Sequence, residues 1–137
     1  MISEFDIDEV EQVCVWRLTG IFSADAMMAG YERRAALPGF TYGMGTLADI
    51  RDLEFDARGR PEIAEYARRA GAEQSRSGRF EFQTAIVVSP DYNRELAAFF
   101  TSIAPLHMAS RSRVFEDLDA ARNWLISQRV GGNAGAV

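Results

Sequence analysis

The sequence contains no lysine, and all fifteen of its basic residues are arginine. A Walker A phosphate loop, a Schiff-base enzyme and a pyridoxal phosphate site each require a lysine amine at the reacting position. A bias toward arginine is typical of GC-rich coding sequences. Whatever its origin, the absence of lysine excludes these three classes of function.

Cysteine and long apolar runs are equally scarce. Cys14 is the only cysteine, so no disulfide can form within the chain, and its position between Val13 and Val15 predicts a thiol buried in a strand. No apolar run approaches the ~20 residues that a membrane-spanning helix needs. The first residues also lack the basic and then apolar pattern of a signal peptide. We therefore expect a cytoplasmic protein without stable membrane insertion.

Positive charge is neither in excess nor clustered. The net charge is −5, and the densest basic pairs, Arg33–Arg34 and Arg68–Arg69, lie among acidic neighbours, so we expect no binding to nucleic acid. His107 is the only histidine. A catalytic histidine needs a nucleophile and an orienting carboxylate, and a metal-binding histidine needs further ligands. We expect a loop or partly packed histidine, and no catalytic residue, metal site or cofactor.

The residues that are present suffice for one domain. The chain has 137 residues, 47% of them hydrophobic, which is enough for a core without disulfides or metal. We assign residues 1–127 to a single α/β domain. Residues 128–137 are rich in glycine and have little to bury, so we expect a flexible C-terminal tail.

Hydrophobic periodicity and punctuation by glycine and proline define the expected elements. Strands are predicted at 2–7, 13–19, 44–50, 80–88 and 110–115. Helices are predicted at 24–35 after the cap Ser23, from Pro61 to Gly71, from Pro90 to 103 after the cap Ser89, and from an acidic cap at Asp117 or Asp119 through Trp124. Residues 74–78 read as a polar loop. A hairpin followed by strand and helix in alternation predicts a five-stranded, mostly parallel mixed sheet with about four helices.

Four short segments carry a resemblance to a known family. They are Leu18–Gly20, Thr46–Ile50, Thr84–Val88, and the ending from Val114 through Trp124 and Leu125. With the order of elements, these segments resemble the SpoIIAA-like family. The resemblance implies a STAS-type fold, which is related to the CRAL-TRIO lipid-carrier domains. The motifs are short and hydrophobic, so they indicate architecture rather than activity.

A charged segment after the third predicted strand is the best candidate site. In open α/β sheets, ligands gather at the carboxyl ends of the strands. We assign a candidate ligand-binding site to Asp49, Arg51, Asp52, Arg58 and Ser89. Its arginines could hold an anion. A solvated, salt-bridged loop is the alternative interpretation, and a metal-assisted hydrolase on Asp49, Asp52 and Asp56 is a distant third.

Two signalling roles lack the residues that they require. In STAS domains that antagonise anti-sigma factors, a phosphorylated serine lies near the start of the helix after this strand. Here the matching segment is Asp56–Pro61, and no serine or threonine occurs from Asp49 to Pro61. A response-regulator receiver needs a lysine near its last strand and an acidic pair after its first. Neither phosphoserine nor phosphoaspartate signalling is expected at this segment.

Aromatic residues allow two interpretations. Phe80, Phe82, Tyr92, Phe99 and Phe100 either pack the core or line an apolar cavity, and core packing is favoured. Apolar side chains left exposed at Met27, Met28 or Tyr31 would serve a homodimer.

Together these patterns predict a function without catalysis. We expect a regulatory module that binds a protein partner or a second copy of itself. The alternative is a carrier or sensor for a small apolar or anionic ligand.

Overall fold

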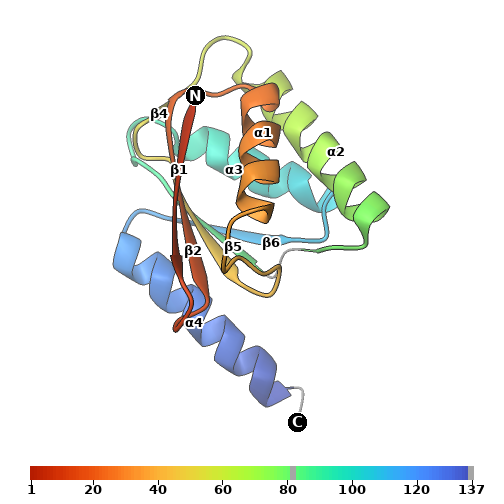
Figure 1. Cartoon of the computed structure of the whole chain (residues 1–137). Helices are drawn as coiled ribbons and strands as arrows, with labels where there is room; N and C mark the ends of the chain where they lie inside the picture. The colour runs from red at the N-terminus through yellow and green to blue at the C-terminus, as the bar shows by residue number, and fades with distance from the viewer. Residues whose placement is uncertain (81–82, 136–137) are drawn as a thin grey trace.

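The computed structural model describes residues 1–80 and 83–135, with side chains as far as residue 129. A six-stranded sheet forms its middle layer (Figure 1). Five strands follow the order β1-β2-β3-β5-β6, and the short β4 pairs with the end of β2. The strands are β1 (Ile2–Asp8), β2 (Val13–Ile21), β3 (Gly45–Asp49), β4 (Leu53–Glu54), β5 (Gln83–Val87) and β6 (Arg111–Phe115).

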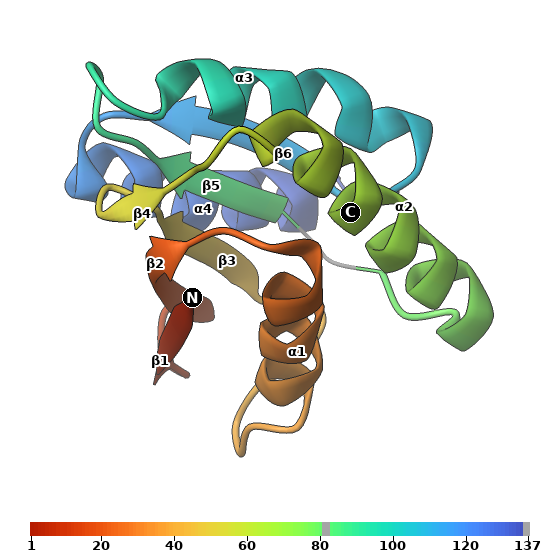
Figure 2. The same cartoon turned by 90° about the horizontal axis from the view of Figure 1, so that it is seen from above.

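Helices cover both faces of the sheet. Helices α1, α2 and α3 lie over one face and α4 lies under the other, as Figures 1 and 2 show from two directions. No helix of the described residues is long and apolar enough to cross a bilayer. The helices are α1 (Ala24–Ala35), α2 (Gly59–Ser77), α3 (Arg94–Ile103), the 3-10 turn η1 (Ala104–Leu106) and α4 (Leu118–Gly135).

The strand directions confirm the predicted mixed α/β sheet. β1 and β2 form an antiparallel hairpin, whereas β2, β3, β5 and β6 pair in parallel. The addition to the prediction is β4, which lies in the segment expected to be a charged loop. Leu53 is buried in the core, and its strand pairs with Gly20 and Ile21 of β2. Because burial of Leu53 is favourable, Leu53 and Glu54 pair with the sheet and are not part of a loop.

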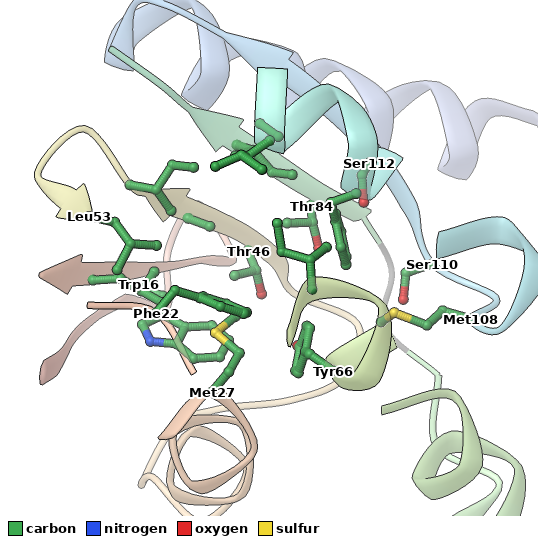
Figure 3. A pocket seen from close by; sticks show the side chains of 18 of the residues that line it. Trp16, Phe22, Met27, Thr46, Leu53, Tyr66, Thr84, Met108, Ser110 and Ser112 are labelled. Atoms are coloured by element: carbon green, nitrogen blue, oxygen red, sulfur yellow. The ribbon is translucent and has the colours of Figure 1, made fainter. Parts of the chain in front are cut away.

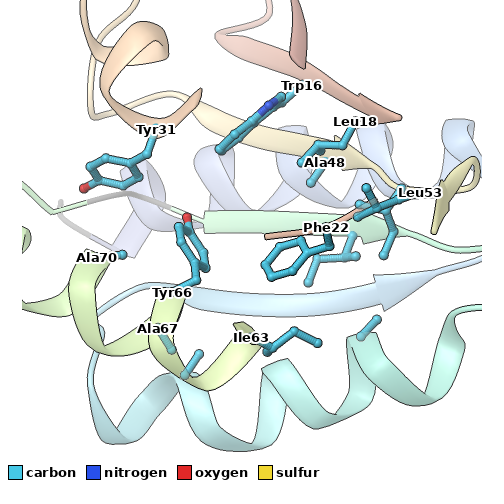
Figure 4. Close-up of a cluster of buried hydrophobic side chains, with 14 of the residues drawn as sticks. Trp16, Leu18, Phe22, Tyr31, Ala48, Leu53, Ile63, Tyr66, Ala67 and Ala70 are labelled. Atoms are coloured by element: carbon cyan, nitrogen blue, oxygen red, sulfur yellow. The ribbon is translucent and has the colours of Figure 1, made fainter. Parts of the chain in front are cut away.

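The sheet separates two hydrophobic cores because successive side chains of a strand point to opposite faces. The larger core lies beneath α1, α2 and α3 and includes Trp16, Leu18 and Tyr66 (Figure 4). The smaller core lies against α4 and includes Val13, Leu47, Ala85, Val87, Ala121 and Leu125. Cys14 is buried in β2, as its apolar neighbours predict.

Two predicted helix caps are confirmed. The Ser23 side chain accepts a hydrogen bond from the Ala26 amide at 3.1 Å, so it caps α1. The Asp117 carboxylate accepts one from the Ala120 amide at 2.9 Å, at the start of α4. Each cap satisfies an N-terminal amide that has no partner within its own helix.

The predicted loop at residues 74–78 is wrong. α2 continues to Ser77 and ends at Gly78, whose φ of 70° gives the left-handed cap that glycine favours. Gln74 is buried rather than solvated. Its side-chain amide donates to the Ser110 hydroxyl at 3.0 Å and accepts from the Ala109 amide at 3.1 Å. These partners, distant in sequence, make burial of a polar helical residue favourable.

The predicted start of the third helix is also wrong. α3 begins at Arg94, and residues 90–93 form a turn before it. Ser89 therefore does not cap a helix that begins at Pro90. Its carbonyl instead accepts hydrogen bonds from the amides of Tyr92 and Asn93. The strand before it begins at Gln83; Phe80 is exposed, and Phe82 lies outside the described residues.

The C-terminal helix extends past the predicted domain boundary. α4 runs to Gly135, so the backbone is helical over most of the segment that we expected to be a flexible tail. Adding residues to an existing helix needs no new nucleus, which explains why a weakly apolar sequence continues it. Residues 136 and 137 lie outside the described residues.

Candidate functional site

The charged segment after β3 begins with a bidentate ion pair. Arg51 donates from Nε and Nη2 to the two carboxylate oxygens of Asp49, each at 2.9 Å, and its backbone amide donates to Asp49 Oδ1 at 3.2 Å. The Asp49 side chain is 9% exposed and that of Arg51 is 45% exposed. The pair thus lies at the carboxyl end of β3 with one partner buried and one at the surface.

Two opposing effects set the protonation of Asp49. Burial raises the pKa of this carboxyl, but the hydrogen bonds and positive charge of Arg51 outweigh burial, and the pKa of Asp49 lies below its ordinary value of 3.8. The Asp49 hydrogen bond raises the pKa of Arg51 in turn. Because Arg51 is engaged by Asp49 on two atoms, an anionic ligand at this guanidinium would have to compete with a bound carboxylate.

The other charged residues of the segment form separate pairs. Arg17 of β2 contacts Asp52 at 2.9 Å, and Arg58 contacts Asp56 at 2.9 Å. The carboxylates of Asp49, Asp52 and Asp56 therefore face three different guanidinium groups. No group of three or more metal-ligating side chains is found among the described residues.

Ser89 and the loop after β3 are joined through Asn93, a residue that the sequence reasoning missed. Asn93 is fully buried. Its side-chain oxygen accepts from the Ser89 amide at 2.9 Å, while its Nδ2 donates to the carbonyls of Ile50 and Leu53. Asn93 thus fixes the carboxyl-terminal edge of the sheet. The role of Asp49, Arg51, Asp52, Arg58 and Ser89 in binding stays a prediction.

An apolar cavity lies between the sheet and the helices α1, α2 and α3 (Figure 3). It has a volume of about 80 Å³. Its walls come from strands, helices and loops across the whole chain, including Trp16, Phe22, Leu53, Phe55, Tyr66, Leu96, Phe100 and Met108. A dry cavity of about 150 Å³ can hold benzene, so a space of roughly half that volume suits an apolar group smaller than benzene.

The aromatic residues singled out from the sequence differ from those that line the cavity. Of that set, Phe100 lines it, Phe99 packs at the edge of the larger core, and Phe80 and Tyr92 are exposed. The missed aromatic residues are Trp16, Phe22, Phe55 and Tyr66. Alternation in β2 indicates that Trp16 points inward, but no local pattern shows that a space remains beside it.

The α1 residues expected to serve a homodimer face the protein interior. Met28 and Tyr31 are buried in the larger core, and Met27 lines the cavity. The condition for a dimer surface on this helix, apolar side chains left exposed, is therefore not met at Met28 and Tyr31, and Met27 is only half-buried. The stripe is instead the inner face of an amphipathic helix.

A buried arginine forms part of the cavity wall. Arg34 of α1 is 1% exposed, and its Nη1 donates to the Thr46 hydroxyl at 3.0 Å. Its guanidinium lies 5.0 Å from the Trp16 ring centroid and 5.1 Å from that of Tyr31, at cation–π distance. The pair Arg33–Arg34 was interpreted only as surface charge, because sequence spacing does not show that one of the two points inward.

Comparison with known proteins supports the architecture. No family model matches the chain, and no curated protein matches it. Among solved structures, it is similar to an uncharacterized protein of the DUF3478 family from Shewanella loihica PV-4, which has a SpoIIAA-like fold. The sequences are 17% identical, the TM-score is 0.55, and the match covers 90% of this chain and 92% of the other. At this identity the likeness concerns the fold alone: this chain has the SpoIIAA-like fold.

Proposed function

We propose that this protein is a non-catalytic binding domain that holds a small apolar ligand in the cavity between the sheet and helices α1, α2 and α3. The cavity is the observation that supports this proposal most directly, because fifteen of the twenty residues that line it are apolar or aromatic. Apolar cavities of small volume stay dry and can bind small apolar molecules such as xenon. The ion pairs of the charged segment also fit the absence of catalysis in this proposal, because its carboxylates are already bound by arginines.

Thermal unfolding in the presence of apolar probes tests this function. A ligand at ~100 times its dissociation constant should stabilise the protein by about 2.7 kcal/mol. Replacing Ala97, a buried cavity residue of α3, by leucine fills the space and should abolish the stabilisation. Ala98→Leu, on the exposed side of the same helix, is the matched control and should leave it unchanged. Equal stabilisation of both variants would contradict binding in the cavity.

Regulation through a protein partner or a second copy is the second candidate. It is favoured by two apolar side chains exposed at either end of α3: Tyr92 is 56% exposed and Leu106 is 77% exposed. Single exposed apolar residues are common on protein surfaces, so these two mark only where such a contact would form. Light scattering should then show a dimer that Tyr92→Ser with Leu106→Ser dissociates. Ile21→Ser, at an exposed site elsewhere, should have no such effect. A monomer at all concentrations would exclude the homodimer.

A further inference from the structure

The two outer strands of the sheet carry opposite charges. Among the described residues, β1 forms one edge of the main sheet and β6 forms the other (Figure 2). An edge strand presents backbone amides and carbonyls that can bind a further strand. Side-chain charges on such an edge determine which strand it accepts, because opposite charges on facing strands stabilise pairing and like charges oppose it.

The edge at β1 is acidic on the face of the sheet that α4 covers. Three carboxylates alternate along the strand, those of Glu4, Asp6 and Asp8. They share this face because Val15, the β2 partner of Asp6, packs against the core beneath α4. Asp8 binds Arg122 of α4 at 2.6 Å. Glu4 and Asp6 are exposed and, among the described residues, belong to no ion pair, so their carboxylates can bind another partner.

The edge at β6 is basic on the same face. Arg111 and Arg113 alternate along the strand, and both are exposed. Arg113 pairs in register with Ala85 of β5, which belongs to the core beneath α4, so both guanidinium groups lie on the α4 face. In the part of the chain that the structure describes, neither arginine belongs to an ion pair. The Arg113 guanidinium lies over the Phe115 ring, 5.1 Å from its centroid.

A second copy placed beside the first would continue the sheet and bring these charges together. β6 runs parallel to β2 through β3 and β5, whereas β1 runs antiparallel to β2. A copy in the same orientation therefore places its β1 antiparallel to β6 of the first, with both α4 faces on the same side. In the register with Asp6 opposite Arg113, Glu4 lies diagonal to the same guanidinium. Asp6 in turn lies diagonal to Arg111.

The same register suits the opposite face and the length of each edge. It places Phe5 opposite Val114, two half-buried apolar side chains that a further strand would cover. On β1, the Ser3 carbonyl already accepts a hydrogen bond from Arg33 of α1. The edge available for pairing is therefore residues 4–8, which matches the five residues of β6.

From these edges we infer that the protein associates with copies of itself by pairing β1 of one copy with β6 of the next. Two β1 edges would bring carboxylates together and two β6 edges would bring guanidinium groups together, so only the unlike pairing is complementary. This interface is heterologous: association continues into a chain of copies unless it closes into a ring. Neither a ligand in the cavity nor a contact at α3 is needed for it, so this self-association goes beyond the proposed function.

Sedimentation velocity over a range of protein concentrations tests the association. At low ionic strength, the average mass should rise above the 15.2 kDa of one chain as the concentration increases. It should fall toward the mass of one chain in ~1 M salt, where the screening length is ~3 Å. The mass of one chain at every concentration, or association that salt does not change, would overturn the inference.

Charge reversal locates the interface. Asp6→Arg and Arg113→Glu should each weaken association about tenfold or more, because each places like charges on facing strands. An equimolar mixture of the two variants should associate again, since the unchanged β6 of the first meets the unchanged β1 of the second. Both substitutions in one chain should also restore association, because the two edges have then exchanged their charges.

Two controls separate this interface from other surfaces. Glu32→Arg, at an exposed position on α1, reverses one charge and should associate like the unchanged protein. Tyr92→Ser with Leu106→Ser removes the exposed apolar groups near α3 and should also leave this pairing intact. Melting curves establish that each variant is folded. If the folded variants Asp6→Arg and Arg113→Glu associate as tightly as the controls, or if their mixture stays monomeric, the pairing of β1 with β6 is wrong.

Discussion

Asn93 shows how much one side chain can hold in place. Its amide group joins Ser89 to the carbonyls of Ile50 and Leu53, across two loops and the start of a helix. Asn93 is fully buried, so if its side chain were removed, the amide and the two carbonyls that it binds could not form hydrogen bonds with water instead. A local sequence pattern gives no sign of this role, since the two carbonyls belong to residues about forty positions away in the chain.

Asn93→Ala should lower the free energy of unfolding by about 1–3 kcal/mol, the usual cost of a buried polar group that loses its partner. Urea denaturation measures the change. Asn123→Ala is the matched control, because Asn123 is exposed on α4, and it should shift the midpoint little. A loss of the same size in both variants would mean that the hydrogen bonds of Asn93 are not what stabilises this edge of the sheet.

Asp49 should give the protein part of its sensitivity to acid. Its folded-state pKa lies below the ordinary value of 3.8, so its ion pair with Arg51 stabilises fully above that value. This contribution is lost as the pH falls through the lowered pKa. Asp49→Asn lacks the contribution at every pH, so the gap in unfolding free energy between the two proteins should narrow below about pH 4.

Denaturant titrations at several pH values measure this gap. Asp91→Asn, at an exposed position, controls for the removal of one carboxylate. A gap for Asp49→Asn that stays constant down to the acid transition would show that the ion pair does not contribute to the pH dependence.

Among the elements, α2 packs most closely at Gly71. A Cβ atom added there would lie 2.0 Å from the His107 carbonyl oxygen, so the helix backbone and the turn after η1 could not both keep their places. Gly71→Ala should therefore destabilise the protein by about 1–3 kcal/mol despite its better helix propensity. Gly43→Ala has room for its methyl group and should be neutral or slightly stabilising. Thermal unfolding compares the two, and equal melting temperatures would contradict the close approach.

Elements were predicted from the sequence where local chemistry determines them. The caps Ser23 and Asp117 bond to amides three residues away, and such contacts can be inferred from short patterns. The last turn of α2 was missed because Gln74 binds Ala109, 35 residues further along. β4 was missed because its two residues pair with the end of β2. Long-range partners, rather than propensity, decided these cases.

The candidate site illustrates the same limit. The sequence placed Asp49 and Arg51 correctly at the carboxyl end of β3. The pairs Asp49–Arg51 and Asp56–Arg58 each join residues two positions apart, whereas Asp52 pairs with Arg17 of β2. The cavity could not be predicted in the same way. Alternation indicates which face of a strand is buried, but whether two facing layers fill the space between them depends on side chains from every element.

At the scale of the whole molecule, the two faces of the sheet differ in the space that they leave. Close approaches occur on both faces: a Cβ added to Gly45 would lie 2.9 Å from Leu125 on the α4 face, and one added to Gly30 would lie 2.8 Å from Trp16 on the other. The cavity, however, lies on the face covered by α1, α2 and α3. We infer that α4 and its core supply stability, while the other face can tolerate the looser packing that a binding site needs.

This difference predicts unequal costs for truncating large side chains. Leu125→Ala leaves a new cavity in the tight core and should cost about 2–5 kcal/mol, whereas Met27→Ala enlarges an existing space from a half-buried position and should cost less than about 2 kcal/mol. Urea denaturation of the two variants measures both losses. Comparable losses would mean that the cavity face is as rigid as the α4 face, and a ligand could then enter only a space already shaped for it.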